Sequence, residues 1–206
     1  MAINTNKWNK IRYTLYTPGY DFIAKYFRNS RKKSIESLNV KPGDKILIIG
    51  AGTGLDLEFF ITDCEIFATD ITPSMIERII KRNMTLNRNV QATVMDGQSL
   101  SFANNTFDFV ILHLILAVIP NSIACLNEAE RVLKNHGQIA VFDKFVKKNK
   151  KVSTMRKIAN ILTNFLFTDI TRNFESIVEK SELKILSDND ADFKGVFRLI
   201  KLEKNI

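Results

Sequence analysis

Cysteine and long apolar stretches are both scarce in this chain of 206 residues. Its two cysteines, Cys64 and Cys125, show neither the spacing of metal ligands nor a disulfide framework. The longest apolar run, residues 109–119, is interrupted by His113 and is too short to span a bilayer. The first residues are polar and aromatic and lack the apolar core of a secretory signal. We therefore expect a reduced, cytoplasmic protein without a bound metal.

Acidic residues are scarce in the first 41 positions, where nine lysines and arginines face only Asp21 and Glu36. This segment alone carries +7 of the formal net charge of +8. A second basic cluster, residues 144–157, leads into a segment whose apolar residues recur at helical spacing. A basic amphipathic helix can lie on an anionic membrane surface, here the inner face of the membrane. The alternative is a lid packed on the domain, with solvated lysines at its rim.

Glycine is also sparse, with eight in the chain, yet three fall in one pentapeptide, Gly50-Ala51-Gly52-Thr53-Gly54. An apolar strand is predicted before this loop, and a second predicted strand leads to Asp70. Glycines in such a loop let the chain turn sharply and let a ligand lie against bare backbone. A carboxylate after the second strand can accept hydrogen bonds from both hydroxyls of a ribose. The pattern predicts a nucleotide-type site, with a tight turn that binds nothing as the alternative.

The spacing of these glycines excludes two common phosphate sites. No Gly-Lys-Ser/Thr follows, so there is no P-loop, and a dinucleotide site would have glycine in place of Leu55. The G-x-G-x-G spacing instead resembles motif I of class I S-adenosylmethionine-dependent methyltransferases, whose ligand has a ribose but no phosphate. The resemblance implies S-adenosyl-L-methionine as cofactor, held by residues 50–54, Asp70 and Ile71.

A second stretch, residues 90–110, resembles the D-A/G-x-x-L-x-F-x-x-x-x-F-D-x-V signature of the same superfamily. By that resemblance Asp96 accepts from the adenine amino group, and the backbone of Gly97 and Gln98 frames the ring. We interpret the two phenylalanines of the signature, Phe102 and Phe107, as core residues. Its second aspartate, Asp108, is interpreted as a structural hydrogen-bonding residue.

Strands and helices alternate through the first two thirds of the chain, which predicts an α/β protein with a mostly parallel sheet covered on both faces. The resemblance implies a Rossmann-like, seven-stranded class I methyltransferase fold with an antiparallel last strand. We expect an N-terminal helical cap over residues 1–41, broken at Pro18-Gly19, and one methyltransferase domain over residues 42–206. The expected strands are 45–49, 65–69, 90–95, 107–114, 138–142, 183–187 and 196–202; the expected later helices are 72–86, 122–133, 153–167 and 172–181.

A closer resemblance covers nearly the whole chain. Residues 8–21, 113–120, 125–134 and 140–145 are similar to bacterial methyltransferases of the ubiquinone/menaquinone type, most of all to the phosphatidylethanolamine N-methyltransferase-like branch. This implies a small-molecule or lipid-headgroup acceptor, methylated on nitrogen, carbon or oxygen. The chain departs from the pattern in two places. Ile48 replaces a frequent acidic residue, and Asn135-His136-Gly137 replaces a Pro-Gly-Gly turn.

Catalytic candidates come from the carboxyl ends of the strands, where open α/β sheets bind their ligands. His113 ends the fourth strand, and its imidazole is suited to act as a general base or to position the acceptor. A buried histidine that bonds to backbone is the alternative. Other side chains can border the acceptor pocket or simply pack: Asp143, Lys144, Tyr13, Tyr16 and Tyr20.

Two further functions stay open at this stage. A nucleic-acid or protein methyltransferase would also explain the basic charge. However, the Asn/Asp-Pro-Pro-Tyr motif of many enzymes that methylate exocyclic amines does not follow the fourth strand, so we expect no nucleic-acid partner. The other possibility is a non-catalytic domain that binds S-adenosylmethionine for assembly.

Overall fold

The computed structural model describes residues 4–60, 63–146, 169, 171–192 and 196–205, with the backbone alone for residues 16–25. Within these ranges seven strands form one sheet in the order β3-β2-β1-β4-β5-β7-β6. Strands β1 to β5 are parallel, and β7 runs antiparallel to both β5 and β6. This confirms the predicted class I methyltransferase fold. The strands are β1 (Lys45–Ile49), β2 (Glu65–Asp70), β3 (Val90–Val94), β4 (Phe107–His113), β5 (Leu133–Lys144), β6 (Leu183–Asp190) and β7 (Phe197–Lys204).

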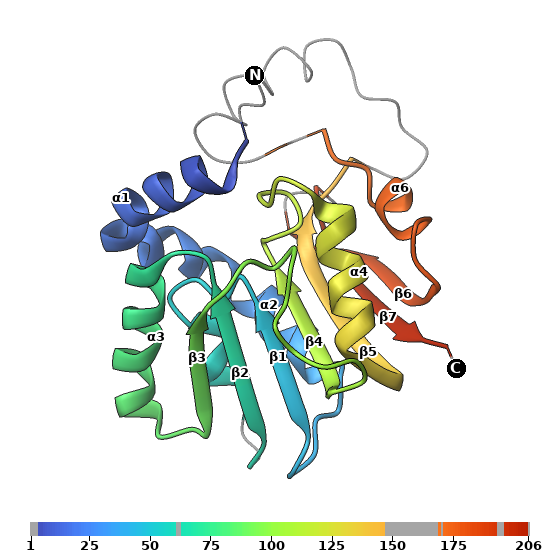
Figure 1. Cartoon of the computed structure of the whole chain (residues 1–206), viewed down its shortest axis with the longest axis horizontal. Helices are drawn as coiled ribbons and strands as arrows, with labels where there is room; N and C mark the ends of the chain where they lie inside the picture. Colours follow the sequence, from blue (N-terminus) through green and yellow to red (C-terminus); the bar gives the residue numbers. More distant parts are fainter. Residues whose placement is uncertain (1–3, 61–62, 147–168, 170, 193–195, 206) are drawn as a thin grey trace.

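Helices cover both faces of this sheet (Figure 1). On one face lie α4 and α6, and on the other lie α2, η2 and α3. The long helix α1 lies beyond the end of the sheet, above α3 in Figure 1. The helices are α1 (Asn6–Ala24), η1 (Lys25–Phe27), α2 (Arg28–Glu36), η2 (Leu55–Phe59), α3 (Pro73–Leu86), α4 (Ser122–Val132) and α6 (Phe174–Val178).

Strand β1 shows how the sequence produces a two-sided core. Its side chains alternate, so that Leu47 and Ile49 pack under α4 while Ile46 and Ile48 pack under α2 and α3. All four are at most 1% exposed. Burying a side chain of this size typically contributes about 1.5–3 kcal/mol. The apolar run of β1 therefore holds the glycine loop, which follows directly, on a rigid base.

Two boundaries at the N-terminal end and in β5 differ from the expectation. Helix α1 continues through Pro18-Gly19 to Ala24, although an interior proline removes a helical hydrogen bond and crowds the preceding turn, and η1 follows directly. Strand β5 begins at Leu133, which pairs with Phe107. The expected turn at residues 135–137 is an irregularity within this strand, where His136 has a φ of 59°.

Two more differences concern the C-terminal part. Strand β6 runs on through the acidic segment to Asp190, where the Asp188 carboxylate forms an ion pair with the Arg198 guanidinium of β7. Helix α6 is shorter than expected, and its N-terminus is capped by Asn173, whose side chain accepts from the Ser176 amide. The expected helix at residues 153–167 lies outside the described residues. Among the helices that are described, none is long and apolar enough to cross a membrane.

Candidate active site

The glycine loop between β1 and η2 adopts a conformation that favours glycine. Gly50, Gly52 and Gly54 have φ angles of 68°, 56° and 79°, in the left-handed region that other residues enter at a cost. A Cβ atom on Gly50 would lie 2.6 Å from Cδ1 of Ile115. The loop is tied to β2 by the Ala51 amide, which donates to the Thr69 carbonyl at 2.8 Å. Bare backbone is therefore required where the loop faces the residues that follow β4.

Asp70 ends β2 beside this loop. Its Oδ2 accepts from the Gly52 amide at 3.0 Å, and its Oδ1 accepts from the Thr72 amide at 2.8 Å. The Thr72 side chain and the Ile71 amide also stabilise the ionised carboxylate. Burial raises the pKa of Asp70, although these backbone hydrogen bonds act in the opposite direction. The carboxylate is held in one orientation by the backbone.

Asp96 follows β3, and a hydrogen bond from the side-chain amide of Asn6 joins it to α1. Its Oδ1 accepts from the Gln98 backbone amide at 3.0 Å, while Asn6 Nδ2 donates to its Oδ2 at 2.5 Å. Gln98 Nε2 donates to Asn6 Oδ1, and the Asn121 amide donates to Gln98 Oε1. A Cβ on Gly97 would lie 2.6 Å from Cγ2 of Ile49. The start of α1 and the turn after β3 thus meet at the Asp96 carboxylate, and Gln98 links this turn to the start of α4.

A cavity joins these elements at the carboxyl ends of the strands. Three side chains of α1 form one wall, and the residues directly after β4 form another. The described lining is Asn6, Asn9, Tyr13, Ile49, Gly50, Gly52, Asp70, Ile71, Thr72, Met75, Met95, Asp96, Gly97, Leu114, Ile115, Val118 and Ile119. Most of the predicted cofactor residues line this cavity, while Ala51, Thr53, Gly54 and Gln98 lie beside it in the same loops.

The chemistry of this lining fits S-adenosylmethionine. Asp70 and Asp96, at the ends of neighbouring strands, place two carboxylates in the lining, which suits a ligand with hydroxyl and amino donors. Methionine and isoleucine side chains, Met75, Met95 and Ile119, offer apolar contact for a planar ring. No lysine or arginine belongs to the described lining, in keeping with a ligand without phosphate.

His113 lies outside this cavity, contrary to its prediction as a base facing the acceptor. Its Nδ1 lies 2.9 Å from Asp56 Oδ1 and its Nε2 lies 2.9 Å from Ser34 Oγ, with 1% of the side chain exposed. Burial alone would raise the pKa of Asp56, but Arg31 and His113 hold it well below its usual range. Because Asp56 is then a carboxylate, Nδ1 of His113 donates to it, and Nε2 of His113 forms a second hydrogen bond with the Ser34 hydroxyl.

The physical reason is the alternation of β4. Side chains two apart in a strand share a face, and Ile111 belongs to the core under α2 and α3. His113 therefore points to that face, whereas the chain enters the cavity only at Leu114. The placement agrees with the alternative of a buried histidine, although its partners are side chains and not backbone groups. We do not carry it forward as a base.

The remaining acceptor-pocket candidates separate into two groups. Asp143 is buried, and its Oδ2 accepts from the Ala117 amide at 2.9 Å. Burial raises the pKa of Asp143, while its backbone hydrogen bonds act in the opposite direction. Lys144 places its ammonium 5.9 Å from the centre of the Phe197 ring. Neither lines the cavity, whereas Tyr13 does. The side chains of Tyr16 and Tyr20 lie outside the described part of the chain.

Sequence reasoning missed Asn6 and Asn9, which line the cavity from α1. Asn6 is 90 positions away from its partner Asp96. The available signal was the placement of two asparagines three positions apart at the start of a helix, beside Trp8. That pattern is too common in first helical turns to indicate a site on its own.

Comparisons with known proteins agree with this geometry. A model of the methyltransferase domain matches residues 46–137. The phosphatidylethanolamine N-methyltransferase of Cereibacter sphaeroides is 22% identical over 188 residues, which cover 90% of this chain and 92% of the relative. The demethylmenaquinone methyltransferase of Staphylococcus saprophyticus is 31% identical over 118 residues, which cover 55% of this chain and 50% of the relative. This chain therefore matches about half the length of the second relative.

A solved structure shows the same fold. The complex between the Haloferax volcanii Trm112 methyltransferase activator and the putative methyltransferase contains a chain that superposes with a TM-score of 0.76 at 15% identity, covering 94% of this chain and 98% of that chain. Strand order, site geometry and sequence similarity agree with one another. The chain has the class I methyltransferase fold and is similar over most of its length to S-adenosylmethionine-dependent methyltransferases.

Proposed function

We propose that this methyltransferase acts on an amine of a small molecule or a lipid headgroup, with an ethanolamine phospholipid as the leading acceptor. The observation that carries the proposal is the similarity to a phosphatidylethanolamine N-methyltransferase over 90% of the chain. The wall after β4 supports it, because Leu114, Ile115, Val118 and Ile119 are all apolar. Such a wall accepts the apolar part of a molecule and excludes water from the reacting atoms.

Methyl transfer requires few catalytic groups from the protein. When bound, the cofactor supplies an activated methyl group on sulfur. The cavity then has to align the nucleophile and exclude water. Tyr13 is the one titratable side chain of the described lining besides the two carboxylates, and the Arg12 guanidinium lies 5.1 Å from its ring centre. We assign the Tyr13 phenol to holding the acceptor amine.

A methyl-transfer assay tests this function. Labelled S-adenosylmethionine is incubated with vesicles containing phosphatidylethanolamine, with demethylmenaquinone, and with small amines. We expect label in the phospholipid. Label in demethylmenaquinone alone would establish carbon methylation and overturn the amine acceptor. Label in none of them, with cofactor still bound, would favour a domain that binds the cofactor without catalysis, or a macromolecular acceptor.

Tyr13 provides a second test with a matched control. Tyr13→Phe removes only the hydroxyl, so turnover should fall while affinity for S-adenosylhomocysteine stays close to wild type. Tyr26→Phe is the control, since Tyr26 is 72% exposed and does not line the cavity. Unchanged turnover in Tyr13→Phe would show that the phenol is a packing group.

We also propose that the acceptor is reached at an anionic membrane surface. The outward face of α1 combines exposed Lys7 and Lys10 with the apolar Ile11 and Leu15, which are 46% and 71% exposed. Such a face suits an interface of anionic headgroups and acyl chains. Each basic residue near such a surface contributes on the order of 1 kcal/mol.

Sedimentation with vesicles tests the membrane proposal. The protein should bind anionic vesicles more than neutral ones, and salt should weaken the binding. Replacing Lys147, Lys148, Lys150 and Lys151 by Ser, all outside the described residues, should reduce binding without changing cofactor affinity. Wild-type protein that ignores anionic vesicles at low salt would indicate a freely diffusing acceptor.

A further inference from the structure

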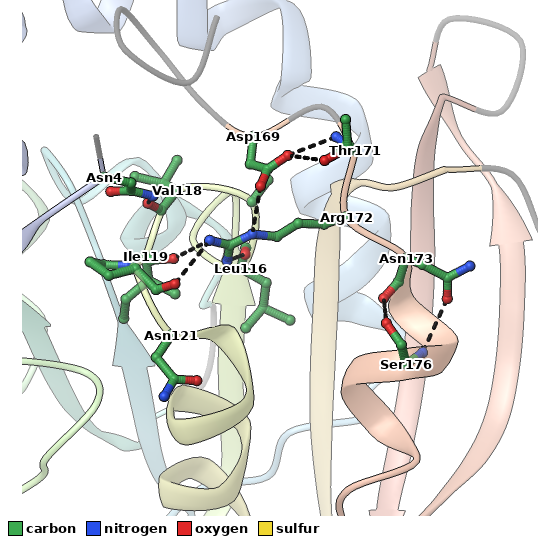
Figure 2. Close-up of polar contacts among 12 residues, drawn as sticks. Asn4, Leu116, Val118, Ile119, Asn121, Asp169, Thr171, Arg172, Asn173 and Ser176 are labelled. Carbon is green, nitrogen blue, oxygen red and sulfur yellow. Dashed lines mark hydrogen bonds and ion pairs between the residues drawn. The ribbon is translucent and has the colours of Figure 1, made fainter. Parts of the chain in front are cut away.

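The loop after β4, residues 114–120, has two sides with different surroundings. On the cavity side it contributes four of the lining residues. On the other side its carbonyl groups are bound by residues from distant parts of the chain (Figure 2). We name it the post-β4 loop. Within it, the amides of Val118 and Ile119 both donate to the Ile115 carbonyl at 2.9 Å.

Arg172 makes most of the contacts on this second side. Its Nη1 donates to the Leu116 carbonyl, and its Nη2 donates to the carbonyls of Ile119 at 2.5 Å and Pro120 at 3.2 Å. In Figure 2 its side chain extends from the segment before α6 toward Leu116 and Ile119. A guanidinium has five N–H donors in a fixed plane, so one side chain can satisfy several carbonyl groups at once.

Asp169 holds Arg172 in place and adds a contact of its own. Its Oδ2 lies 3.6 Å from the arginine Nε, and its Oδ1 accepts from both the amide and the hydroxyl of Thr171. The Asp169 amide donates to the Ala117 carbonyl at 2.9 Å. The two side chains of the ion pair are 12% and 19% exposed for Arg172 and Asp169. The pair is therefore largely removed from water.

Two further residues complete the support of the loop. Asp143 accepts from the Ala117 amide, and Asn4 Nδ2 donates to the Val118 carbonyl at 2.7 Å. The carbonyls of residues 116–120 are thus all bound from outside the loop. The loop then meets the cofactor site at both ends. Ile115 packs at Gly50, and Cδ1 of Ile119 lies 3.3 Å from the position of a Cβ on Gly97.

We propose that Arg172 is a positioning residue for methyl transfer: it holds the post-β4 loop in the conformation that forms the cavity wall. The inference rests on the proposed function only in giving this wall the role of receiving the acceptor. Arg172 touches neither the cavity nor the reacting atoms, since it does not belong to the described lining. Its effect on binding passes through Ile115, Val118 and Ile119.

Hydrogen exchange and calorimetry test the proposal on the full chain. Arg172→Met keeps the length of the side chain and removes its donors. The amides of Val118 and Ile119 should then exchange faster, on the order of tenfold. Affinity for S-adenosylhomocysteine should fall by roughly threefold to thirtyfold, the usual range for residues that act through a neighbour. Arg172→Lys should restore part of the exchange protection and part of the ligand affinity, because an ammonium can bind some of the carbonyls.

Arg131→Met is the matched control. Arg131 also bridges loop carbonyls, those of Leu100 and Phe102, and also pairs with an acidic residue, Glu128. It does not line the cavity. The variant should lose comparable stability while leaving the amides of residues 118–119 and the ligand affinity unchanged.

The possible results distinguish a failure of the Arg172 proposal from a failure of the proposed acceptor. Unchanged exchange at residues 118–119 in a folded Arg172→Met protein would overturn the proposal. So would an equal loss of affinity in Arg131→Met, because the effect would then be one of general stability. Failure to methylate phosphatidylethanolamine would overturn the proposed acceptor alone, since the exchange and binding measurements involve no acceptor. With an active acceptor, Arg172→Met should raise KM for that acceptor more than it lowers kcat.

Discussion

His113 and Asp56 are joined by a hydrogen bond of 2.9 Å that is buried on the face of the sheet opposite α4. Asp56 also accepts from Nη1 of Arg31 at 2.9 and 2.8 Å, and Ser34 lies on the other side of the imidazole ring. The network joins α2, the start of η2 and the end of β4. Because η2 begins directly after Gly54, the network anchors the far end of the glycine loop.

Asp56→Asn should destabilise the fold strongly. The change removes the charge that balances the buried Arg31, whose side chain is only 5% exposed. Breaking one partner of a buried ion pair costs about 3–5 kcal/mol. Urea unfolding should show a loss of that size in the free energy of unfolding. Glu58→Gln is the control, because Glu58 pairs with Arg28 at the surface, with side chains 30% and 55% exposed. It should cost under about 1 kcal/mol.

The same carboxylate predicts an acid-dependent loss of stability. Arg31 and His113 outweigh burial and lower the pKa of Asp56 from its ordinary value of 3.8. A lowered pKa in the folded state means that the unfolded chain binds the proton first as pH falls. The stabilisation is therefore full above the ordinary pKa and is lost as pH falls toward the folded value. The stability difference between wild type and Asp56→Asn should therefore shrink as pH falls below about 4. A difference that keeps growing below that pH would contradict this assignment.

Asp70→Ala should weaken binding of S-adenosylhomocysteine. Losing a charge-assisted hydrogen bond typically costs about 1.5–3 kcal/mol, which is roughly tenfold to a hundredfold in affinity. Calorimetry on the folded variant measures it directly, and wild-type affinity would exclude Asp70 from the cofactor site.

Acidification should weaken the binding of S-adenosylhomocysteine to the wild-type protein. Burial raises the pKa of Asp70 in the free protein, and ribose hydroxyls would donate to its ionised form. Affinity should therefore be constant above the raised pKa and fall as pH drops through it, with a proton released on binding in that range. Asp70→Asn has no such proton, so its affinity should stay flat. Calorimetry in buffers of different ionisation enthalpy detects the proton.

Local sequence signals predicted the part of the site that is built from consecutive residues. The strand before Gly50, the carboxylate at the end of β2 and the aspartate after β3 each follow from an apolar run with a breaker at its end. The antiparallel direction of the last strand, β7, came from the family resemblance, whereas the order of the strands in the sheet came only from the structure. The strand ends and their carboxylates depend on short stretches of chain, in which hydrophobic periodicity is informative.

Tertiary partners could not be predicted in this way. Arg172 lies 56 positions from the carbonyl of Leu116, and Asn6 lies 90 positions from Asp96. No periodicity connects such pairs, and only the folded sheet brings them together. The face of His113 is a different case. Alternation along β4 places it with Ile111, but which face carries α2 was known only from the structure.

Gly50→Ala tests whether the glycine loop is required for its fit against the post-β4 loop. The new Cβ would lie 2.6 Å from Cδ1 of Ile115, and the φ of 68° is strained for alanine. Gly43→Ala is a matched control, because its φ of 88° is also strained while nothing lies within 4 Å of its Cβ. Each variant should lose roughly 1–2 kcal/mol of stability from backbone strain. Only Gly50→Ala should also lose cofactor affinity, by roughly fivefold to a hundredfold, since crowding of a packed site costs about 1–3 kcal/mol. Equal affinities in the two variants would mean that Ile115 moves aside freely, and that the post-β4 loop is less rigid than its hydrogen bonds indicate.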